Sequence, residues 1–177
     1  MELTLIPSDA FENNDLVAVY CNQQATDRFL VGRVVMLGND ALLLCLISPD
    51  MEFDGLCLCM SHSIFRIEQN SQYLNSMNKL FIPYVTEHFA EQPWDYFLRI
   101  AEKGNMTIHI MDRFGKKVVG VPIKHTMGTV NIRCKHSNGP LTYVMQMKKH
   151  DVSLMEINPD SKWNAQILKG KGVLENA

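Results

Sequence analysis

The sequence has no long apolar run, no marked excess of charge of either sign and no basic leader. No apolar segment of the 177 residues approaches the roughly 18 needed to cross a bilayer, so we expect no membrane association. The first residues, Met1 to Leu5, lack a basic region leading into an apolar core, and we expect no secretory leader. Lys and Arg total 17 and Asp and Glu 19, giving a net charge of −2, which argues against a wholly basic nucleic-acid coat or a polybasic membrane binder.

Cysteine is scarce and lacks the spacing of a metal site. The chain has 5 cysteines, an odd number that suits free thiols in a reducing cytoplasm. Cys57 and Cys59 would share one face of a strand, whereas zinc sites usually place two residues between their cysteines on a turn, and only His62 is near. We interpret all five as small core hydrophobes and expect no metal, no cofactor and a cytoplasmic location.

Motifs for catalysis are also missing. The chain has no G-x-S-x-G, P-loop, dinucleotide fingerprint or H-E-x-x-H. Alternate carboxylates at Asp50, Glu52 and Asp54 superficially suggest calcium, but the segment is too short for an EF-hand. A Cys-His nucleophile pair would need a proximity that no local pattern indicates. We therefore expect no catalytic residues and no enzymatic activity.

What the sequence does contain is a globular composition with an uneven charge. It is 46% hydrophobic and 20% charged, as in ordinary folded domains. Residues 1–83 carry a net charge of −6, residues 84–103 one of −2 and residues 104–177 one of +6. The shift predicts two domains, an acidic one over 1–83 and a basic one over 84–177. The asymmetry favours either two solvated surfaces that differ by chance or binding of an anion by the second half.

The chain also shows signs of a repeat with an offset of about 88–90 residues. At that offset Gly32 falls on Gly120, Cys45 falls near Cys134, and His62 falls on His150. Each half contains five short segments of period two, and a glycine in the second segment permits a sharp bend. We predict a mainly β fold of two small five-stranded Sm/SH3-like barrels in tandem. The predicted strands start near Leu16, Phe29, Ala41, Leu56 and Ile64, and near Met106, Lys117, Val130, Leu141 and Val152.

A helix is predicted between the halves. Trp94, Phe97 and Leu98 share one face of a helical segment over 86–103, and Gly104 supplies a stop. We expect this helix to join the barrels and a short helical segment to follow each barrel.

The order of these elements is similar to a known family. A helix entering the first strand of a bent five-stranded barrel resembles the Sm-like family, and Lys148-Lys149-His150 resembles the Lys-His turn of its bacterial Hfq branch. The segments Ile47 to Pro49 with Asp54-Gly55, and 65–68 with Tyr73, resemble bacterial two-barrel proteins that carry no assigned activity. The resemblance implies a tandem Sm-like fold with an RNA-facing turn in the second barrel.

Two hypotheses for the function follow, neither of them enzymatic. The first is weak binding of single-stranded RNA by the second barrel, because phosphates attract clustered cations and histidine or tyrosine rings can stack on bases. The second is a protein–protein adaptor, in which the acidic and basic barrels recognise each other or a partner. The lysines could then simply be those common on the outside of β-sheets, where they also block edge-to-edge aggregation. A homo-oligomer formed through barrel edges is a further hypothesis. The RNA-binding candidates are Lys148, Lys149, His150, Lys116, Lys117, Arg133 and Lys135, with Lys124, His125, His136 and Tyr143 as further basic or ring-bearing residues of the same barrel.

Overall fold

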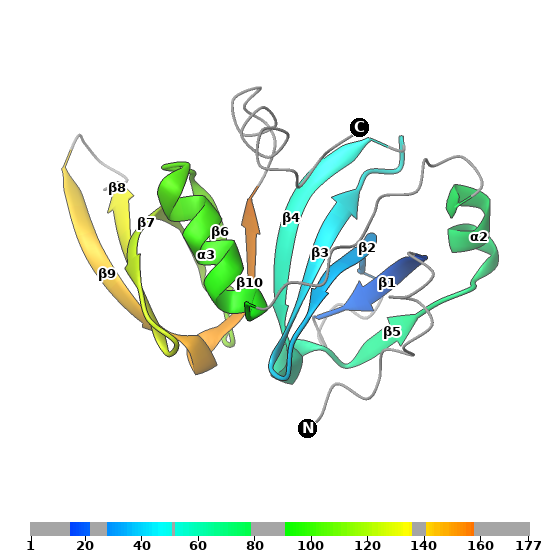
Figure 1. Ribbon diagram of the computed structural model, residues 1–177, viewed down its shortest axis with the longest axis horizontal. Helices are drawn as coiled ribbons and strands as arrows, with labels where there is room; N and C mark the ends of the chain where they lie inside the picture. The colour runs from blue at the N-terminus through cyan, green and yellow to red at the C-terminus, as the bar shows by residue number, and fades with distance from the viewer. Residues whose placement is uncertain (1–14, 22–27, 51, 79–90, 136–140, 158–177) are drawn as a thin grey trace.

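One continuous sheet is the main feature of the computed structural model (Figure 1). The structure describes residues 15–21, 28–50, 52–78, 91–135 and 141–157. Ten antiparallel strands follow the order β5-β1-β2-β3-β4-β10-β6-β7-β8-β9. The strands are β1 (Leu16–Tyr20), β2 (Leu30–Leu37), β3 (Ala41–Ile47), β4 (Phe53–Met60), β5 (Arg66–Glu68), β6 (Ile108–Asp112), β7 (Lys117–His125), β8 (Thr129–Lys135), β9 (Thr142–Lys148) and β10 (Val152–Ile157).

The prediction of a mainly β protein is confirmed, and the strands form one open sheet rather than two closed barrels joined by a helix. Strand β4 pairs with β10, with Leu58 opposite Met155 and Cys59 opposite Leu154, so one open sheet runs through both halves. The physical reason is that an edge strand exposes unpaired N–H and C=O groups. The apolar β4 meets this need by pairing with β10 instead of closing a barrel within the first half.

Burial along the strands explains why they are recognisable in the sequence. All seven residues of β3 are buried, because both of its faces are covered. In β8 the burial alternates, with Val130, Ile132 and Cys134 inside and the residues between them outside or half-buried. A strand covered on one face gives this alternation, and a strand covered on both faces gives a continuous apolar run.

Helix α3 (Pro93–Lys103) covers the sheet, contacting β7, β3 and β4. Trp94, Phe97 and Leu98 are fully buried, as expected, and burying such side chains contributes about 1.5–3 kcal/mol each. The Trp94 indole N–H donates to the Thr126 carbonyl at 2.8 Å, which ties the helix to the end of β7. The predicted helix is thus confirmed over 93–103, and residues 86–90 of that prediction lie outside the described residues.

A shorter helix, α2 (Gln72–Asn78), follows β5 and agrees with the expected helical segment after the first half. The segment expected after the second half lies outside the described residues. Two single-turn 3₁₀ helices, η1 (Ser61–Ser63) and η2 (Lys149–Asp151), connect β4 to β5 and β9 to β10.

The sheet register corrects one detail of the sequence comparison. Gly32 lies opposite Leu46, and Gly120 lies opposite Cys134. With the two glycines aligned, Leu46 falls on Cys134, and Cys45 falls on Arg133. The alignment of Cys45 with Cys134 is one residue out of register, and on a strand a shift of one residue exchanges the two faces.

Candidate nucleic-acid interface

Five cationic side chains lie on one side of the second half of the sheet. Val121 on β7 lies opposite Arg133 on β8, which in turn lies opposite Val144 on β9. Residues directly opposite each other project to the same side of a sheet, and so do residues two apart on a strand. Applied along the three strands, this register defines a surface that we call the basic face, whose cations are Lys117, Lys124, Arg133, Lys135 and Lys148.

A β-bulge adds Lys124 to this face. The pairing of β7 with β8 shifts between Pro122 and Lys124, after which Lys124 lies opposite Asn131. Without the extra residue, the alternation from Lys117 would point Lys124 to the buried side. Asn131 and Arg133 are two residues apart on β8 and project to the same side of the sheet. The bulge therefore places Lys124 on the same side as Arg133.

Packing on the other side of these strands forces the cations outward. Val118, Val130, Ile132 and Cys134 belong to the apolar cluster that includes α3. Their neighbours on each strand must face solvent, and all five cations of the basic face are exposed. Apolar side chains share the face with them, since Val119 is 49% and Val144 is 60% exposed.

The predicted Lys148-Lys149-His150 group is divided between a strand and a turn. Lys148 ends β9 on the basic face, opposite Thr129. Lys149 belongs to η2, where its Nζ lies 2.6 Å from Asp40 Oδ2 and 5.4 Å from the centre of the Trp94 ring. His150 is also in η2, with Nε2 3.5 Å from Asp151 Oδ1. Of the three, only Lys148 lies with the other cations of the basic face.

The remaining basic and ring-bearing candidates lie in several places. Lys116 is in the turn before β7, where its backbone N–H donates to Asp112 Oδ1 at 2.8 Å. His125 Nδ1 lies 2.8 Å from Glu102 Oε1, so this imidazole faces carboxylates of α3. Tyr143 lies opposite Cys134 and therefore projects to the side away from the basic face. His136 lies outside the described residues.

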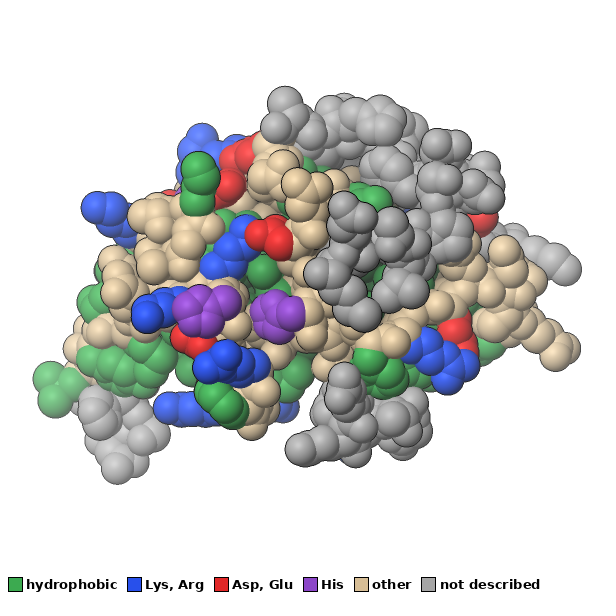
Figure 2. All heavy atoms as spheres, turned by 90° about the horizontal axis from the view of Figure 1, so that it is seen from below, with side chains coloured by type: hydrophobic (Ala, Val, Ile, Leu, Met, Phe, Trp, Pro, Cys, Tyr) green, Lys and Arg blue, Asp and Glu red, His purple; other side chains and the backbone are tan. Residues whose placement is uncertain are grey.

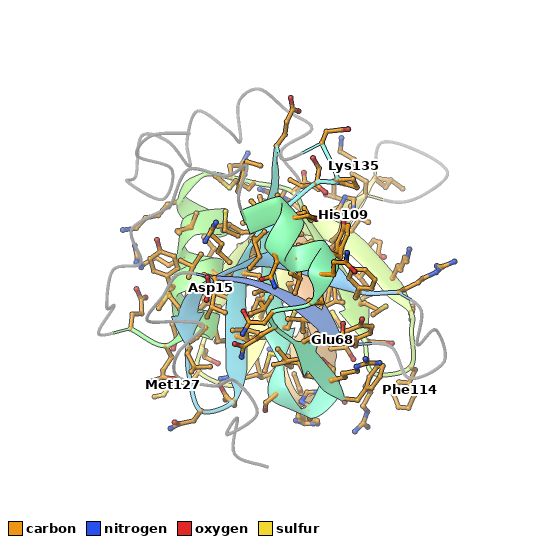
Figure 3. All side chains as sticks on the ribbon, turned by 90° about the vertical axis from the view of Figure 1, so that its right-hand side faces the viewer. Asp15, Glu68, His109, Phe114, Met127 and Lys135 are labelled. Atoms are coloured by element: carbon orange, nitrogen blue, oxygen red, sulfur yellow. The ribbon has the colours of Figure 1, made fainter. Side chains whose placement is uncertain are left out.

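Figure 3 shows how the exposed groups are distributed along the molecule. His109 and Lys135 lie toward one end, whereas Phe114 and Met127, which are 78% and 77% exposed, lie toward the opposite end. The guanidinium of Arg113 stacks over the Phe114 ring, 4.8 Å from its centre. The most exposed aromatic ring among the described residues thus lies away from Lys135 and is covered on one side by an arginine.

An acidic group, Glu156, lies on β10, two strands from β7 in the direction of the first half of the sheet. Glu156 of β10 lies opposite His109 on one side and Cys57 on the other. Burial raises the pKa of the Glu156 carboxyl, Asp54 adds to the rise, and His109 and Lys117 oppose it. The underside of the molecule is also mixed, since Figure 2 shows two histidines among both basic and acidic side chains.

The cysteines show the features of core residues. The sulfurs of Cys57 and Cys59 are 3.6 Å apart and both side chains are fully buried. Burial raises the pKa of the Cys45 thiol to about 12, which keeps it protonated and a poor nucleophile. In the described part of the chain, no group of three or more His, Cys, Asp or Glu side chains is arranged to hold a metal ion.

The sequence indicates most of these cations but not which of them share a face. The alternation of Arg133, Cys134 and Lys135 is the signal that the sequence offers for β8, and the corresponding signal in β7 is interrupted by the bulge.

No described helix is long and apolar enough to span a membrane. No protein-family model matches the chain, and no curated protein matches it.

Proposed function

We propose that the chain is a non-enzymatic binding module that contacts single-stranded RNA weakly through the basic face. The observation that carries the proposal is the presence of five exposed cations on one side of β7, β8 and β9. Residues 104–177, which contain them, have a net charge of +6. Phosphates attract such a surface, and binding is strengthened by release of the counterions they hold.

The composition of the face favours contact with the backbone of the nucleic acid over reading of its bases. The side chains that β7, β8 and β9 project to this side include no Phe, Tyr or Trp. Stacking on an aromatic ring contributes about 1–3 kcal/mol per base in proteins that use it. Without that contribution, the affinity should be low, tolerant of sequence and strongly dependent on salt.

A protein partner is the second candidate function. Val119 and Val144 are exposed between the cations and provide apolar area that a phosphate backbone does not use. An acidic protein surface with an apolar centre would contact both kinds of side chain, as interfaces with an apolar core and a polar rim do. Such a complex would lose less affinity with salt than RNA binding would.

The proposal includes a tandem arrangement of two Sm-like units. The orders β5-β1-β2-β3-β4 and β10-β6-β7-β8-β9 correspond strand by strand. Both units have a bulge in their second strand, after Val34 and after Pro122. The backbone N–H of Ser61 donates to Asp40 O at 2.9 Å, and that of Lys149 donates to Gly128 O at 2.8 Å. Each of these corresponding residues is 88 positions from its counterpart, which supports a duplication.

Titration of labelled single-stranded oligonucleotides at two salt concentrations tests the RNA-binding proposal. The variant Arg133→Ala/Lys135→Ala removes two cations from the basic face. Arg28→Ala/Lys103→Ala removes two exposed cations elsewhere and serves as the control of equal charge. We expect the first variant to bind more weakly and to lower the log–log salt slope by about 0.7 for each phosphate that the protein no longer neutralises.

Three results would contradict the proposal. Wild-type protein that does not bind at low salt excludes RNA as a ligand. Equal weakening in both double variants shows that net charge acts without a defined face. Binding that does not change with salt excludes phosphate contacts and favours the protein partner.

A further inference from the structure

We infer that residues 1–14 of this chain bind to the basic face of the same molecule and compete there with RNA. We call these residues, which lie shortly before β1, the acidic segment. The competition rests on the proposed function, whereas the contact between segment and face does not require that RNA binds.

The basic face carries apolar groups that contact with RNA does not use. Val119 is 49% and Val144 is 60% exposed, and Val144 lies directly opposite Arg133 in the sheet. A phosphate backbone offers these side chains no apolar partner. Exposed apolar side chains among cations fit an occupant that carries both carboxylates and apolar groups.

The acidic segment combines these two kinds of side chain. Residues 1–14 contain three carboxylates and neither lysine nor arginine, so their side chains carry a net charge of −3. Large apolar side chains lie next to or near each carboxylate in the sequence. The carboxylates are Glu2, Asp9 and Glu12, and the large apolar residues include Leu3, Leu5, Ile6 and Phe11.

Charge singles out this segment among those that lie outside the described residues. Counting histidine as neutral, residues 22–27 carry −1, residues 79–90 and 136–140 carry no net charge, and residues 158–177 carry +1. Opposite charges favour association of two surfaces, and like charges oppose it. Residues 1–14 are therefore the best match in charge to the basic face.

The acidic segment is long enough to reach the basic face of its own molecule. Strand β7 is six positions from β1 in the order of the sheet, and neighbouring strands lie about 4.8 Å apart, so the distance along the sheet is about 29 Å (Figure 1). An extended chain spans about 3.3 Å per residue, so the 14 residues reach about 46 Å.

A weak contact is sufficient because the segment is tethered. Tethering gives an effective concentration on the order of 1 mM. A segment with an intrinsic Kd of about 0.2–1 mM for the face would then lower the apparent RNA affinity about two- to sixfold, since RNA binds only molecules whose face is free. Salt screens the attraction between segment and face, so the competition should be strongest at low salt.

Zero-length cross-linking of the wild-type chain, without RNA, tests the contact. A carbodiimide joins a carboxylate to a lysine amine that lies against it. We expect mass spectrometry to find carboxylates of the acidic segment joined to lysines of the basic face. Lys103 is exposed on α3, on the other side of the sheet, and is the internal control. The target lysines are Lys117, Lys124, Lys135 and Lys148.

A mixture of ¹⁵N-labelled and unlabelled chains shows whether the contact is made within one molecule. A cross-linked peptide pair from a single chain is labelled throughout or not at all. We expect these two forms and no pair of mixed label.

Titration of labelled single-stranded oligonucleotides tests the competition. The variant Asp9→Asn/Glu12→Gln removes two carboxylates from the acidic segment. Asp50→Asn/Glu52→Gln removes two exposed carboxylates elsewhere and is the control of equal charge. We expect the first variant to bind RNA about two- to sixfold more tightly than wild type at low salt. The control should change RNA affinity less, and the difference between the variants should shrink as salt rises.

Four results are decisive against the inference or part of it. An absence of cross-links from residues 1–14 to the basic face, or equally frequent cross-links to Lys103, overturns the contact. Peptide pairs of mixed label overturn binding within one molecule. An equal rise in RNA affinity in both double variants overturns the competition. If no variant binds RNA, the proposed function fails and the competition fails with it, but the cross-links still decide whether the acidic segment occupies the basic face.

Discussion

Lys149 and Asp40 form an ion pair across the two halves of the molecule, with Nζ 2.6 Å from Oδ2. Asp40 lies in the turn between β2 and β3, and Lys149 lies in η2, after β9. The lysine side chain is 17% exposed, and its ammonium group is 5.4 Å from the centre of the Trp94 ring. A cation held by a carboxylate and an aromatic ring has little free surface to offer a ligand, although the adjacent Lys148 is exposed.

The substitution Lys149→Ala should therefore affect stability more than binding. Surface ion pairs contribute about 0–1 kcal/mol, and cation–π contacts at exposed sites about 0.5–1 kcal/mol. We expect the free energy of unfolding, measured with urea, to fall by about 1 kcal/mol while RNA affinity changes little. Lys148→Ala is the matched control, and it should weaken RNA binding while leaving the free energy of unfolding nearly unchanged. Loss of RNA affinity in Lys149→Ala at unchanged stability would contradict this assignment.

Replacing Trp94 with Phe should destabilise the protein through one hydrogen bond. Trp94 is fully buried, and its indole N–H donates to the Thr126 carbonyl at 2.8 Å. Phenylalanine keeps much of the apolar area but leaves that carbonyl without this donor, which costs about 1–3 kcal/mol. Urea unfolding measures the loss. In the wild type, the indole N–H should also exchange slowly with solvent, and fast exchange would show that the bond is not maintained.

Gly32 should not tolerate a methyl group, because backbone atoms lie too close. A Cβ at this position would lie 2.4 Å from the Cys45 carbonyl oxygen on the neighbouring strand. We expect Gly32→Ala to lower the free energy of unfolding by about 1–3 kcal/mol, as overpacking does elsewhere. Gly128→Ala is the control, since a Cβ there meets no atom within 4 Å. Equal stability of the two variants would show that the strands can separate without cost.

The strands could be predicted from the sequence because period two is a local property. All ten predicted strands exist, and the apolar face of α3 follows from the spacing of Trp94, Phe97 and Leu98. The pairing of β4 with β10 could not be predicted in the same way. The two strands lie in different halves of the chain, and closing a barrel in the first half would satisfy the same edge of β4.

The side of the sheet on which each lysine lies also could not be predicted from the sequence. Lys148 and Lys149 are consecutive, yet one ends a strand and the other begins η2. The bulge after Pro122 reverses the alternation for Lys124, and no residue type in that segment marks it. Bulges and turns depend on the partner strand. The sequence alone therefore does not show that Lys149 lies off the basic face or that Lys124 lies on it.

The carboxyl of Glu156 should make stability depend on pH in a direction opposite to that of most carboxylates. Its pKa in the folded protein is raised above the ordinary value, mainly by burial and further by Asp54, while His109 and Lys117 act against the rise. The unfolded chain therefore releases this proton at lower pH than the folded chain does. As pH rises from the ordinary value through the raised one, the folded state binds more protons, and its stability falls. Below the ordinary pKa the group is protonated in both states and contributes nothing.

The variant Glu156→Gln isolates this effect, since glutamine resembles the neutral acid in shape and cannot ionise. We expect the variant to be more stable than wild type at neutral pH and the difference to shrink toward zero as the pH falls below the ordinary pKa of glutamate, where the group is protonated in both states. Urea unfolding of both chains over this range measures the difference, in which the contributions of the other carboxylates cancel. His109→Gln in both backgrounds controls for the neighbouring imidazole, which lies opposite Glu156 in the sheet. A difference that is constant with pH, or a variant less stable than wild type at neutral pH, would show that the half-buried carboxylate is satisfied by its neighbours and imposes no cost on the junction between β4 and β10.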